Sequence, residues 1–570
     1  MERKVSRRTG SYPIQDTDFF PHVDSRAQQT IADDNKSLRL PRTLRALNNS
    51  RNITNHPRTL VICLDGTGDQ FDNDNSNIVN FVSCLKKHSP SEQVTYYQSG
   101  IGTYDKGGLK NGIGAAMDMA VGSGLGIHIK DAYNFLMQNY RDGDKICLFG
   151  FSRGAYTVRC LAGMLHKVGL LPASNVSQLN FAYNFYKNDT EDGRELAAGF
   201  KRTFCTHVEV YFVGIWDCVA SVGFIPRRLP FSKSPTNSIR HFRHAMALDE
   251  HRAKFKVCQW QQENPGEHNP KRRGTVDFTP TGRLRRRFGV QKTPNMATNP
   301  QAINGKSNGY TNGHINGSEK RPTTQHSSDS QDSLERKFVA QDKARHRNRF
   351  FETDVLECWF MGCHADVGGG AVANENRHKL SHIPLRWMMR QCFECDTGIL
   401  FNTSRLAEHG LDVQTLWPVY QKPTRPIAGP APSVMAKYET NSLEPLYRRA
   451  AFLPIGPEED QIKDQPSLER LGYVLLSEAN EDYFDALEKC NDMLRIAKVW
   501  WILEVWPIKL RILNKSGDGW EKRVRLNLGR HRGIRDDSPS MHWTVQHAID
   551  EGRYTLKTRC EKGVCWTEII

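Results

Sequence analysis

The chain has 570 residues and a formal net charge of +15, and 38% of its residues are hydrophobic. This length excludes a single small module, and the 11 Trp and 26 Phe exclude a chain that is disordered throughout. Most of the excess charge lies in two polar segments, +4 in residues 1–57 and +10 in residues 266–350. A basic groove on the folded part is therefore not supported, and no nucleic acid is expected as a partner.

Residues 1–57 are rich in charged and turn-forming residues, show no sustained periodicity and are predicted to form a disordered leader. They lack the apolar stretch of a secretory signal. The 14 Cys are scattered, and several, such as Cys63 and Cys147, fall within apolar runs typical of buried strands. These features predict reduced thiols and a cytoplasmic protein. No run of about 20 apolar residues, the length of a membrane-spanning helix, is visible.

From residue 59 onward, apolar strands alternate with helices. Strands followed by Gly-rich loops are predicted in TLVICLDGTGDQ (59–70) and VTYYQSGIGT (94–103), and residues 127–143 have helical spacing. Residues 144–171 predict a strand, a sharp turn and a helix. Further strands are predicted at residues 208–217 and 355–366. This alternation predicts a three-layer α/β fold, in which helices cover both faces of a mostly parallel sheet.

Residues 266–350 are polar, repetitive in composition and too long for an ordinary loop, so they are predicted to form a disordered basic insertion. The insertion divides the α/β domain into a first part, residues 58–265, and a second part, residues 351–455. Within the second part, residues 381–393 have helical spacing, with Ser381 as the predicted N-cap. Residues 456–570 are predicted to form a helix-rich accessory region.

The segment GFSRG (150–154) fits the pattern G-x-S-x-G, in which the chain turns sharply from a strand into a helix and presents a nucleophilic Ser. Spacing alone is weak evidence, because chance supplies on the order of 0.2 such matches in a chain of this composition. The apolar residues 146–149 before the motif and the helical pattern from Ala155 onward provide the context that the motif requires.

A Ser nucleophile needs a His base, and the His needs a carboxylate that orients it. Asp217 ends the apolar run VEVYFVGIW, and His364 ends CWFMGC. Such groups collect at the carboxyl ends of parallel strands, and the chain order Ser, Asp, His is that of α/β-hydrolases. We therefore predict Ser152 as nucleophile, His364 as base and Asp217 as the orienting acid. The alternatives are an ordinary turn Ser and an Asp217 that caps the segment after it.

The oxyanion hole is predicted to use the backbone N–H of Arg153 and that of Gly66 or Thr67 in the segment LDGTG. Asp65 in the same loop either ties the loop by hydrogen bonds or, with Asp366, marks a metal site. Because no paired ligand spacing supports the metal, neither a metal nor another cofactor is predicted.

Three further patterns give little support for a metal, nucleotide-binding or catalytic site. The CxxC pair of Cys392 and Cys395 has no second pair at zinc-finger spacing. The Gly-rich stretch 112–126 does not fit a nucleotide-binding motif. His244 and His251, in RHAMALDEHR, are predicted to lie on a helix among solvated charges.

Taken together, several segments resemble an uncharacterised α/β-hydrolase domain family of fungi and bacteria, which includes the catalytic domain of type VI secretion phospholipase effectors. These segments are LDGTG (64–68), YYQSGIGT (96–103), GFSRGAYTVR (150–159), GIWDCVASVG (214–223), RHAMALDEHR (243–252) and GCHADVGGG (362–370). The resemblance covers residues 58–265 and 351–395. It implies triad positions at Ser152, Asp217 and His364, and hydrolysis of carboxylic esters, with phospholipids as the substrates of the bacterial effectors.

The predicted function is therefore a serine hydrolase that cleaves an acyl lipid, a phospholipid or another ester through an acyl-enzyme. Two alternatives stay open. One is a non-catalytic scaffold that keeps the same fold. The other is a metal-dependent phosphoesterase that uses Asp65, Asp217 and Asp366.

Two interpretations stay open for the segment VWWILEVWPIKLRIL (499–513). Its indoles, Trp500, Trp501 and Trp506, lie among basic residues and favour a membrane interface, so the segment predicts peripheral membrane contact, as do the basic segments. The other interpretation is a helix buried against the core, because Trp is also common in cores and Pro507 interrupts a long amphipathic face.

Overall fold

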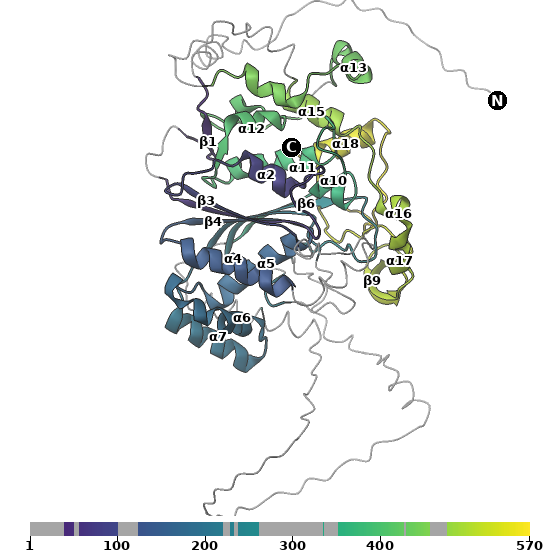
Figure 1. The fold of residues 1–570 in the computed structure, drawn as a ribbon. Helices are drawn as coiled ribbons and strands as arrows, with labels where there is room; N and C mark the ends of the chain where they lie inside the picture. Colours follow the sequence, from purple (N-terminus) through teal and green to yellow (C-terminus); the bar gives the residue numbers. More distant parts are fainter. Residues whose placement is uncertain are drawn as a thin grey trace, which may run out of the picture.

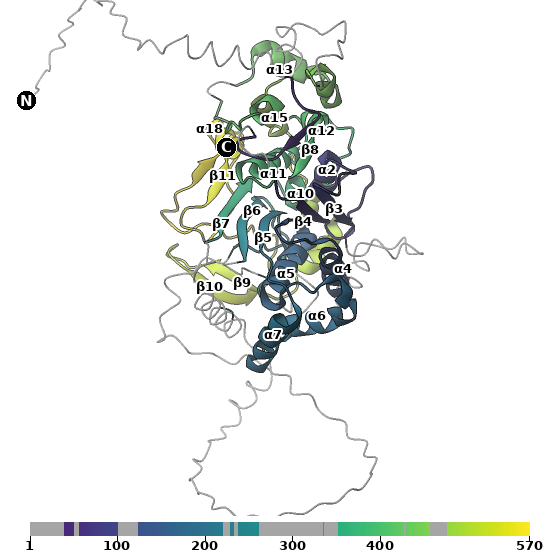
Figure 2. The same cartoon turned by 90° about the vertical axis from the view of Figure 1, so that its left-hand side faces the viewer.

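The computed structural model describes residues 39–50, 56–100, 124–219, 229–232, 238–260, 335, 352–426, 429–455 and 476–570. The predicted insertion 266–350, apart from residue 335, and residues 1–38 of the predicted leader lie outside the described residues. A parallel sheet with helices on both faces forms the centre of the molecule (Figure 1; Figure 2). The predicted three-layer α/β fold is confirmed.

The central sheet has eight strands in the order β12-β11-β7-β6-β5-β4-β2-β3, and every adjacent pair is parallel. In chain order its strands are β2 (Thr59–Leu64), β3 (Gln93–Gln98), β4 (Lys145–Phe151), β5 (Val210–Trp216), β6 (Ile239–Ala247), β7 (Asp354–Phe360), β11 (Ser540–His542) and β12 (Thr567–Ile569). The chain places β3 on one side of β2 and β4 on the other. The order of the strands thus reverses between β2 and β4, and sites in open α/β sheets form at the carboxyl ends beside such a reversal.

Two layers of helices enclose this sheet (Figure 1). One layer is α4 (Gly124–Asn139), α5 (Ser152–Val168), α6 (Leu179–Lys187) and α7 (Glu191–Phe204), and the other includes α2 (Asn77–Cys84), α10 (His364–Gly368), α11 (His382–Glu394) and α12 (Thr403–Glu408). Because both faces are covered, successive residues of a strand enter different cores. On β4, Phe149 packs 4.2 Å from the ring of Phe81 on α2, whereas Leu148 joins the cluster formed with α4 and α5.

Residues 456–570, predicted to be helix-rich, are described from residue 476 onward. They contain the helices α15 (Glu478–Asp485), α16 (Met493–Ile496), α17 (Trp501–Glu504) and α18 (Trp543–Asp550), the 3₁₀ turn η6 (Lys498–Trp500) and the antiparallel hairpin of β9 (Ile508–Leu513) and β10 (Trp520–Arg525). The same region adds β11 and β12 to the central sheet. The C-terminal region is therefore continuous with the α/β core.

The remaining short elements lie before and between these layers. They are β1 (Thr43–Arg45), η1 (Ala173–Gln178), β8 (Leu400–Asn402), η4 (Val413–Thr415), α13 (Pro432–Glu439) and η5 (Leu446–Phe452). β1 pairs antiparallel with β8, and Leu44 on β1 is fully buried. The prediction of a disordered leader is therefore wrong for residues 39–50. The arginines interspersed in LRLPRTLRAL hide the short apolar pattern in this segment.

The segment RHAMALDEHR does not form the predicted helix, because its first half lies within β6. His244 is fully buried there. Its Nε2 accepts a hydrogen bond from the N–H of Cys218 at 3.1 Å, and its Nδ1 lies 2.8 Å from Glu357. These partners satisfy a polar ring inside the sheet, which removes the cost of burying it.

Candidate active site

Ser152 lies at the sharp turn between β4 and α5, where the G-x-S-x-G motif predicted it. Its φ is 55°, a left-handed conformation that residues other than Gly rarely adopt. The flanking glycines make the turn possible. A Cβ on Gly150 would lie 2.6 Å from the Cα of Ala155, and one on Gly154 would collide with the carbonyl oxygen of Leu64. The turn therefore has the geometry of a nucleophile elbow.

The structure brings all three predicted triad residues together. His364 is the first residue of α10 and follows β7. Its Nε2 lies 2.8 Å from the Oγ of Ser152, and its Nδ1 lies 2.5 Å from the Oδ2 of Asp217. All three side chains are buried. One continuous hydrogen-bonded chain thus joins hydroxyl, imidazole and carboxylate.

The carboxylate of Asp217, directly after β5, is held by more than the imidazole. The Arg532 guanidinium forms a bidentate ion pair with it, 2.6 Å from Oδ1 and 2.8 Å from Oδ2. Oδ1 also accepts the N–H of Ala247 at 3.0 Å. Arg532 donates in addition to the carbonyl oxygens of Ala247 and Phe255. The C-terminal region thus supplies the counter-charge of the predicted acid.

The surroundings set the charges of the site. Burial raises the pKa of Asp217, but the charge of Arg532 and the hydrogen bonds from His364 and Arg532 outweigh it and hold this pKa well below its ordinary value. Burial lowers the pKa of His364, against the opposing effect of Asp217. Near neutral pH the site therefore contains a charged carboxylate beside a neutral imidazole. Because Nδ1 donates to Asp217, Nε2 can accept the proton of Ser152.

Aromatic rings enclose the imidazole. The rings of Phe151 and Phe255 lie 4.8 Å and 4.9 Å from that of His364, measured between centroids. Phe255 in turn contacts Trp500 at 5.4 Å, and the guanidinium of Arg252 lies 3.5 Å from the centre of the Phe255 ring. These rings exclude water from the imidazole and account for the desolvation that lowers its pKa.

The three predicted oxyanion donors have different environments. Arg153 is the second residue of α5, and N–H groups in the first turn of a helix have no partner within it. The N–H of Gly66 donates to the Oδ1 of Asp65 at 2.8 Å and is already engaged. Thr67 carries a buried Oγ1 that has no hydrogen-bond partner among the described residues. The N–H of Arg153 is therefore better placed to act as a donor than the N–H of Gly66, which Asp65 already occupies.

The catalytic-domain model of the Tle1-like phospholipase effectors of type VI secretion systems matches residues 58–391, which is more than half of the chain. The chain belongs to this family. Membership of the Tle1-like family indicates a lipid ester hydrolase as the class of protein. An uncharacterized protein of Saccharomyces cerevisiae is 27% identical over 566 residues, which cover 86% of this chain and 79% of that relative.

Two solved structures are similar to this Tle1-like chain. One is an uncharacterized protein from Pseudomonas aeruginosa, at 13% identity and a TM-score of 0.28, over 77% of this chain and 63% of that one. The other is the Tle1 effector bound to the VgrG spike of the type VI secretion system, at 18% identity and a TM-score of 0.21, over 35% of this chain and 47% of that one. This chain thus spans less than two thirds of the length of either solved chain.

Asp65, one predicted metal ligand, ties the loop after β2 in this Tle1-like domain. Its Oδ1 accepts the N–H of Gly66, and its Oδ2 accepts the hydroxyls of Ser76 and Tyr97 at 2.9 Å and 3.0 Å. Burial raises the pKa of Asp65 to about 6. Both carboxylate oxygens already have donors, so this environment fits the loop-tying interpretation.

Asp366 has a separate set of partners. Its Oδ2 accepts the N–H groups of Cys363 and Asn491 at 2.8 Å and 2.9 Å, and its Oδ1 accepts the side-chain amide of Asn491 at 2.7 Å. Asp217 is paired with His364 and Arg532. The three carboxylates of the phosphoesterase alternative thus have separate partners, and no observation favours a shared metal.

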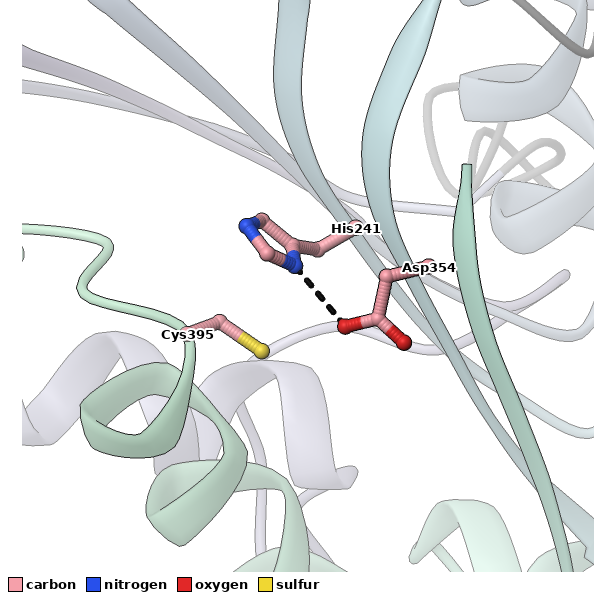
Figure 3. A group of neighbouring side chains, drawn as sticks. All are labelled: His241, Asp354 and Cys395. Atoms are coloured by element: carbon pink, nitrogen blue, oxygen red, sulfur yellow. Dashed lines mark hydrogen bonds and ion pairs between the residues drawn. The ribbon is translucent and has the colours of Figure 1, made fainter. Parts of the chain in front are cut away.

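Figure 3 shows one of two groups of possible metal ligands in the part of the chain that the structure describes. The Nδ1 of His241 on β6 lies 2.9 Å from the carboxylate of Asp354, the first residue of β7, and the thiol of Cys395 is close to both. The guanidinium of Arg243 donates to Asp354 at 2.6 Å and to the Cys395 sulfur at 3.0 Å. The guanidinium of Arg243 therefore already neutralises this group. The group lies near the amino ends of β6 and β7, whereas Ser152 follows the carboxyl end of β4.

Sequence reasoning missed Arg532, Glu250 and Arg252. Glu250 is buried, accepts the N–H of His364 at 3.2 Å and pairs with Arg252 at 2.8 Å. Burial raises the pKa of Glu250, but the charge of Arg252 outweighs it and brings this pKa to about 2. Glu250 and Arg252 fall within RHAMALDEHR, which contributed to the resemblance, whereas nothing in GRHRGIR distinguishes Arg532 from its neighbours.

Proposed function

We propose that this protein is a serine hydrolase that cleaves carboxylic esters of acyl lipids, phospholipids above all, through an acyl-enzyme. The observation that carries the proposal is the hydrogen-bonded chain from Ser152 through His364 to Asp217 at the carboxyl ends of three parallel strands. The Tle1-like family supports a lipid ester as the class of substrate.

In the first half of the reaction, the Oγ of Ser152 attacks the carbonyl carbon of the ester while the Nε2 of His364 takes its proton. The N–H of Arg153, with that of Thr67, stabilises the negative oxygen of the tetrahedral intermediate. Asp217 stabilises the imidazolium, which forms in a site where burial otherwise disfavours its charge. The imidazolium then protonates the leaving alcohol, and Ser152 remains acylated.

In the second half, water takes the place of the alcohol. His364 accepts a proton from that water, the hydroxide attacks the acyl carbon, and the collapse of the second tetrahedral intermediate returns the proton to Ser152. The carboxylic acid leaves. No step requires a metal or another cofactor.

Labelling with a fluorophosphonate tests this proposal, because only an activated Ser reacts with the probe. We expect the intact protein to be labelled on the peptide that contains Ser152. Ser152→Ala should abolish the label, and Ser177→Ala, which changes an exposed Ser on η1, should retain it. A folded protein that stays unlabelled would refute the serine mechanism and leave the non-catalytic scaffold and the metal-dependent phosphoesterase as the alternatives.

The surface beside this site fits a lipid bilayer. Among the helices that the structure describes, none is both long and apolar enough to cross a membrane. The apolar ridge, as we define it here, consists of exposed side chains of α16, α17 and their flanks: Ile496, Val499, Trp501, Ile502, Val505 and Trp506. Exposed patches of this kind mark interaction sites.

The neighbours of the ridge connect it to both the site and an anionic surface. Trp500 is buried and touches Phe255, the ring that covers His364. Lys498 and Lys509 are exposed and lie within or next to the ridge segment in the chain, and three basic residues of β10, the strand paired with β9, are exposed as well. Indoles flanked by cations suit the interface of an anionic membrane. Of the three indoles predicted to contact a membrane, Trp501 and Trp506 are exposed, whereas Trp500 is buried in the core.

Replacing Trp501 and Trp506 together by Ala should weaken binding to mixed phosphatidylserine–phosphatidylcholine vesicles by about ten-fold, because two indoles are lost from the interface. Hydrolysis of a soluble short-chain ester should change little. Vesicle sedimentation measures the binding. Trp500 is left intact, since its removal would disturb the core.

Phe181→Ala is the matched control, because it removes a ring that is 55% exposed on α6, in the helical layer below the sheet in Figure 1. The control should bind vesicles like the unchanged protein. Equal binding by the double Trp variant would refute contact through the ridge.

A further inference from the structure

Two thiols from distant parts of the chain meet next to the proposed base. Cys363, the residue before His364, is buried at the N-terminus of α10. Cys490 is exposed, in the loop between α15 and α16 of the C-terminal region. Their Sγ atoms lie 3.3 Å apart. A disulfide bond is ~2.05 Å long, so the sulfurs would have to approach by roughly 1.3 Å.

The backbone around the two thiols is already fixed in this arrangement. Asn491, the residue after Cys490, donates its N–H and its side-chain amide to Asp366 at 2.9 Å and 2.7 Å. The same carboxylate accepts the N–H of Cys363 at 2.8 Å. Asp366 thus docks the 490–491 loop onto the turn that carries His364, and the thiols are held face to face.

We propose that Cys363 and Cys490 are a reversible disulfide site that covalently ties the C-terminal region to the turn of the catalytic base. Formation of the bond is independent of the hydrolase proposal. Its effect on turnover rests on that proposal, because it acts through the position of His364.

A metal is the competing interpretation, since Cys363, Asp366 and Cys490 together offer three possible ligand atoms. The hydrogen bonds disfavour it. Both oxygens of Asp366 are engaged by N–H donors, and these donors belong to the residues that position the thiols. A metal would compete with these donors for the carboxylate oxygens, whereas a disulfide leaves every one of these hydrogen bonds in place.

With glutathione disulfide as the oxidant, the exposed Cys490 reacts first and the buried Cys363 reacts second. The thiolate of Cys490 attacks one sulfur of glutathione disulfide, whose S–S bond breaks and releases one glutathione thiol. The thiolate of Cys363 then attacks the Cys490 sulfur of the mixed disulfide and releases the second. The two protein thiols lose two electrons and two protons, and the oxidant gains them. The contact with Cys490 and burial raise the pKa of Cys363, which suits the later, resolving role.

The bond should alter both stability and rate. It closes a loop between two residues that are 127 positions apart, which restricts the unfolded chain. It also pulls on the residue next to His364, and a misplacement of about 1 Å near the reacting groups can cost ~10²-fold in rate. We therefore expect the oxidised protein to be more stable and slower.

The test is to incubate the intact protein with glutathione disulfide and compare it with Cys490→Ser and with Cys565→Ser, which changes another exposed Cys. In the unchanged protein and in Cys565→Ser, we expect a cross-linked peptide that joins residues 363 and 490, and a rise of ~5 °C in the unfolding midpoint. We also expect a fall of about ten-fold in kcat. Dithiothreitol should reverse all three changes, and Cys490→Ser should show none of them.

The mass of the cross-linked peptide and the unfolding midpoint do not depend on hydrolysis. These two measurements therefore test the disulfide separately from the proposed activity. A Cys490 that stops at the mixed disulfide with glutathione would overturn the proposal. The proposal would also be overturned if adding zinc protected the two thiols from oxidation, because that result would assign Cys363 and Cys490 to a metal site.

Discussion

Ser152→Ala and His364→Ala are each expected to lower kcat for ester hydrolysis by ~10⁴–10⁶-fold while the protein stays folded. The first change removes the nucleophile. The second removes the group that lies 2.8 Å from it and accepts its proton. The measurement is kcat on a soluble ester, together with the unfolding midpoint of each variant. Because the residues act as a unit, the double variant should be no slower than either single variant.

Two matched controls separate this effect from a general loss of structure. Ser177→Ala changes an exposed Ser, and His241→Ala breaks another His–carboxylate pair of the same sheet, the pair in Figure 3. Both controls should keep nearly full activity. Substantial turnover by Ser152→Ala would refute the assignment of the nucleophile.

Arg532→Met is expected to reduce kcat by ~10²-fold or more, with little change in KM, because Arg532 orients Asp217 and is remote from the reacting ester. Removing the guanidinium leaves a buried carboxylate without its counter-charge. Arg532→Lys should recover part of the activity, since an ammonium restores the charge without the bidentate geometry.

The pH profile distinguishes an Arg532 that positions and charges Asp217 from an Arg532 that only stabilises the fold. Without the cation, the pKa of Asp217 rises, and protonation of His364 is opposed less strongly. Both effects move the acid limb of kcat/KM to higher pH. Arg523→Met serves as the control, because it removes an exposed Arg of the same region whose partner, Glu521, is also exposed. An unchanged acid limb in a folded Arg532→Met variant would limit Arg532 to a structural role.

The fold, and the positions from which Ser152, Asp217 and His364 meet, were predictable because their signals are local. Runs such as TLVICL are apolar after their first residue, since both faces of the sheet are covered, and they are recognisable without any knowledge of their partners. Ser152, Asp217 and His364 each follow such a run. Strand ends are therefore informative even when the residues are far apart in the chain.

The missed features depend on partners far away in the sequence. β6 contains His244 and Arg243, which are polar enough to suggest a solvated helix until Glu357 and Gln391 satisfy them. β11 and β12 have three residues each, too few to show a period. Arg532 is one Arg among several in its segment, and only the folded chain selects it for Asp217.

The ion pair between Arg532 and Asp217 also bears on how the protein is made. The two residues are 315 positions apart, so at a synthesis rate of ~5–20 residues per second the carboxylate leaves the ribosome roughly 15–60 s before its cation. During that interval the nascent chain can form the elbow at Ser152 but cannot neutralise Asp217 inside the sheet. The candidate site is therefore assembled late in translation, long after the strands that carry Ser152 and Asp217 have been made.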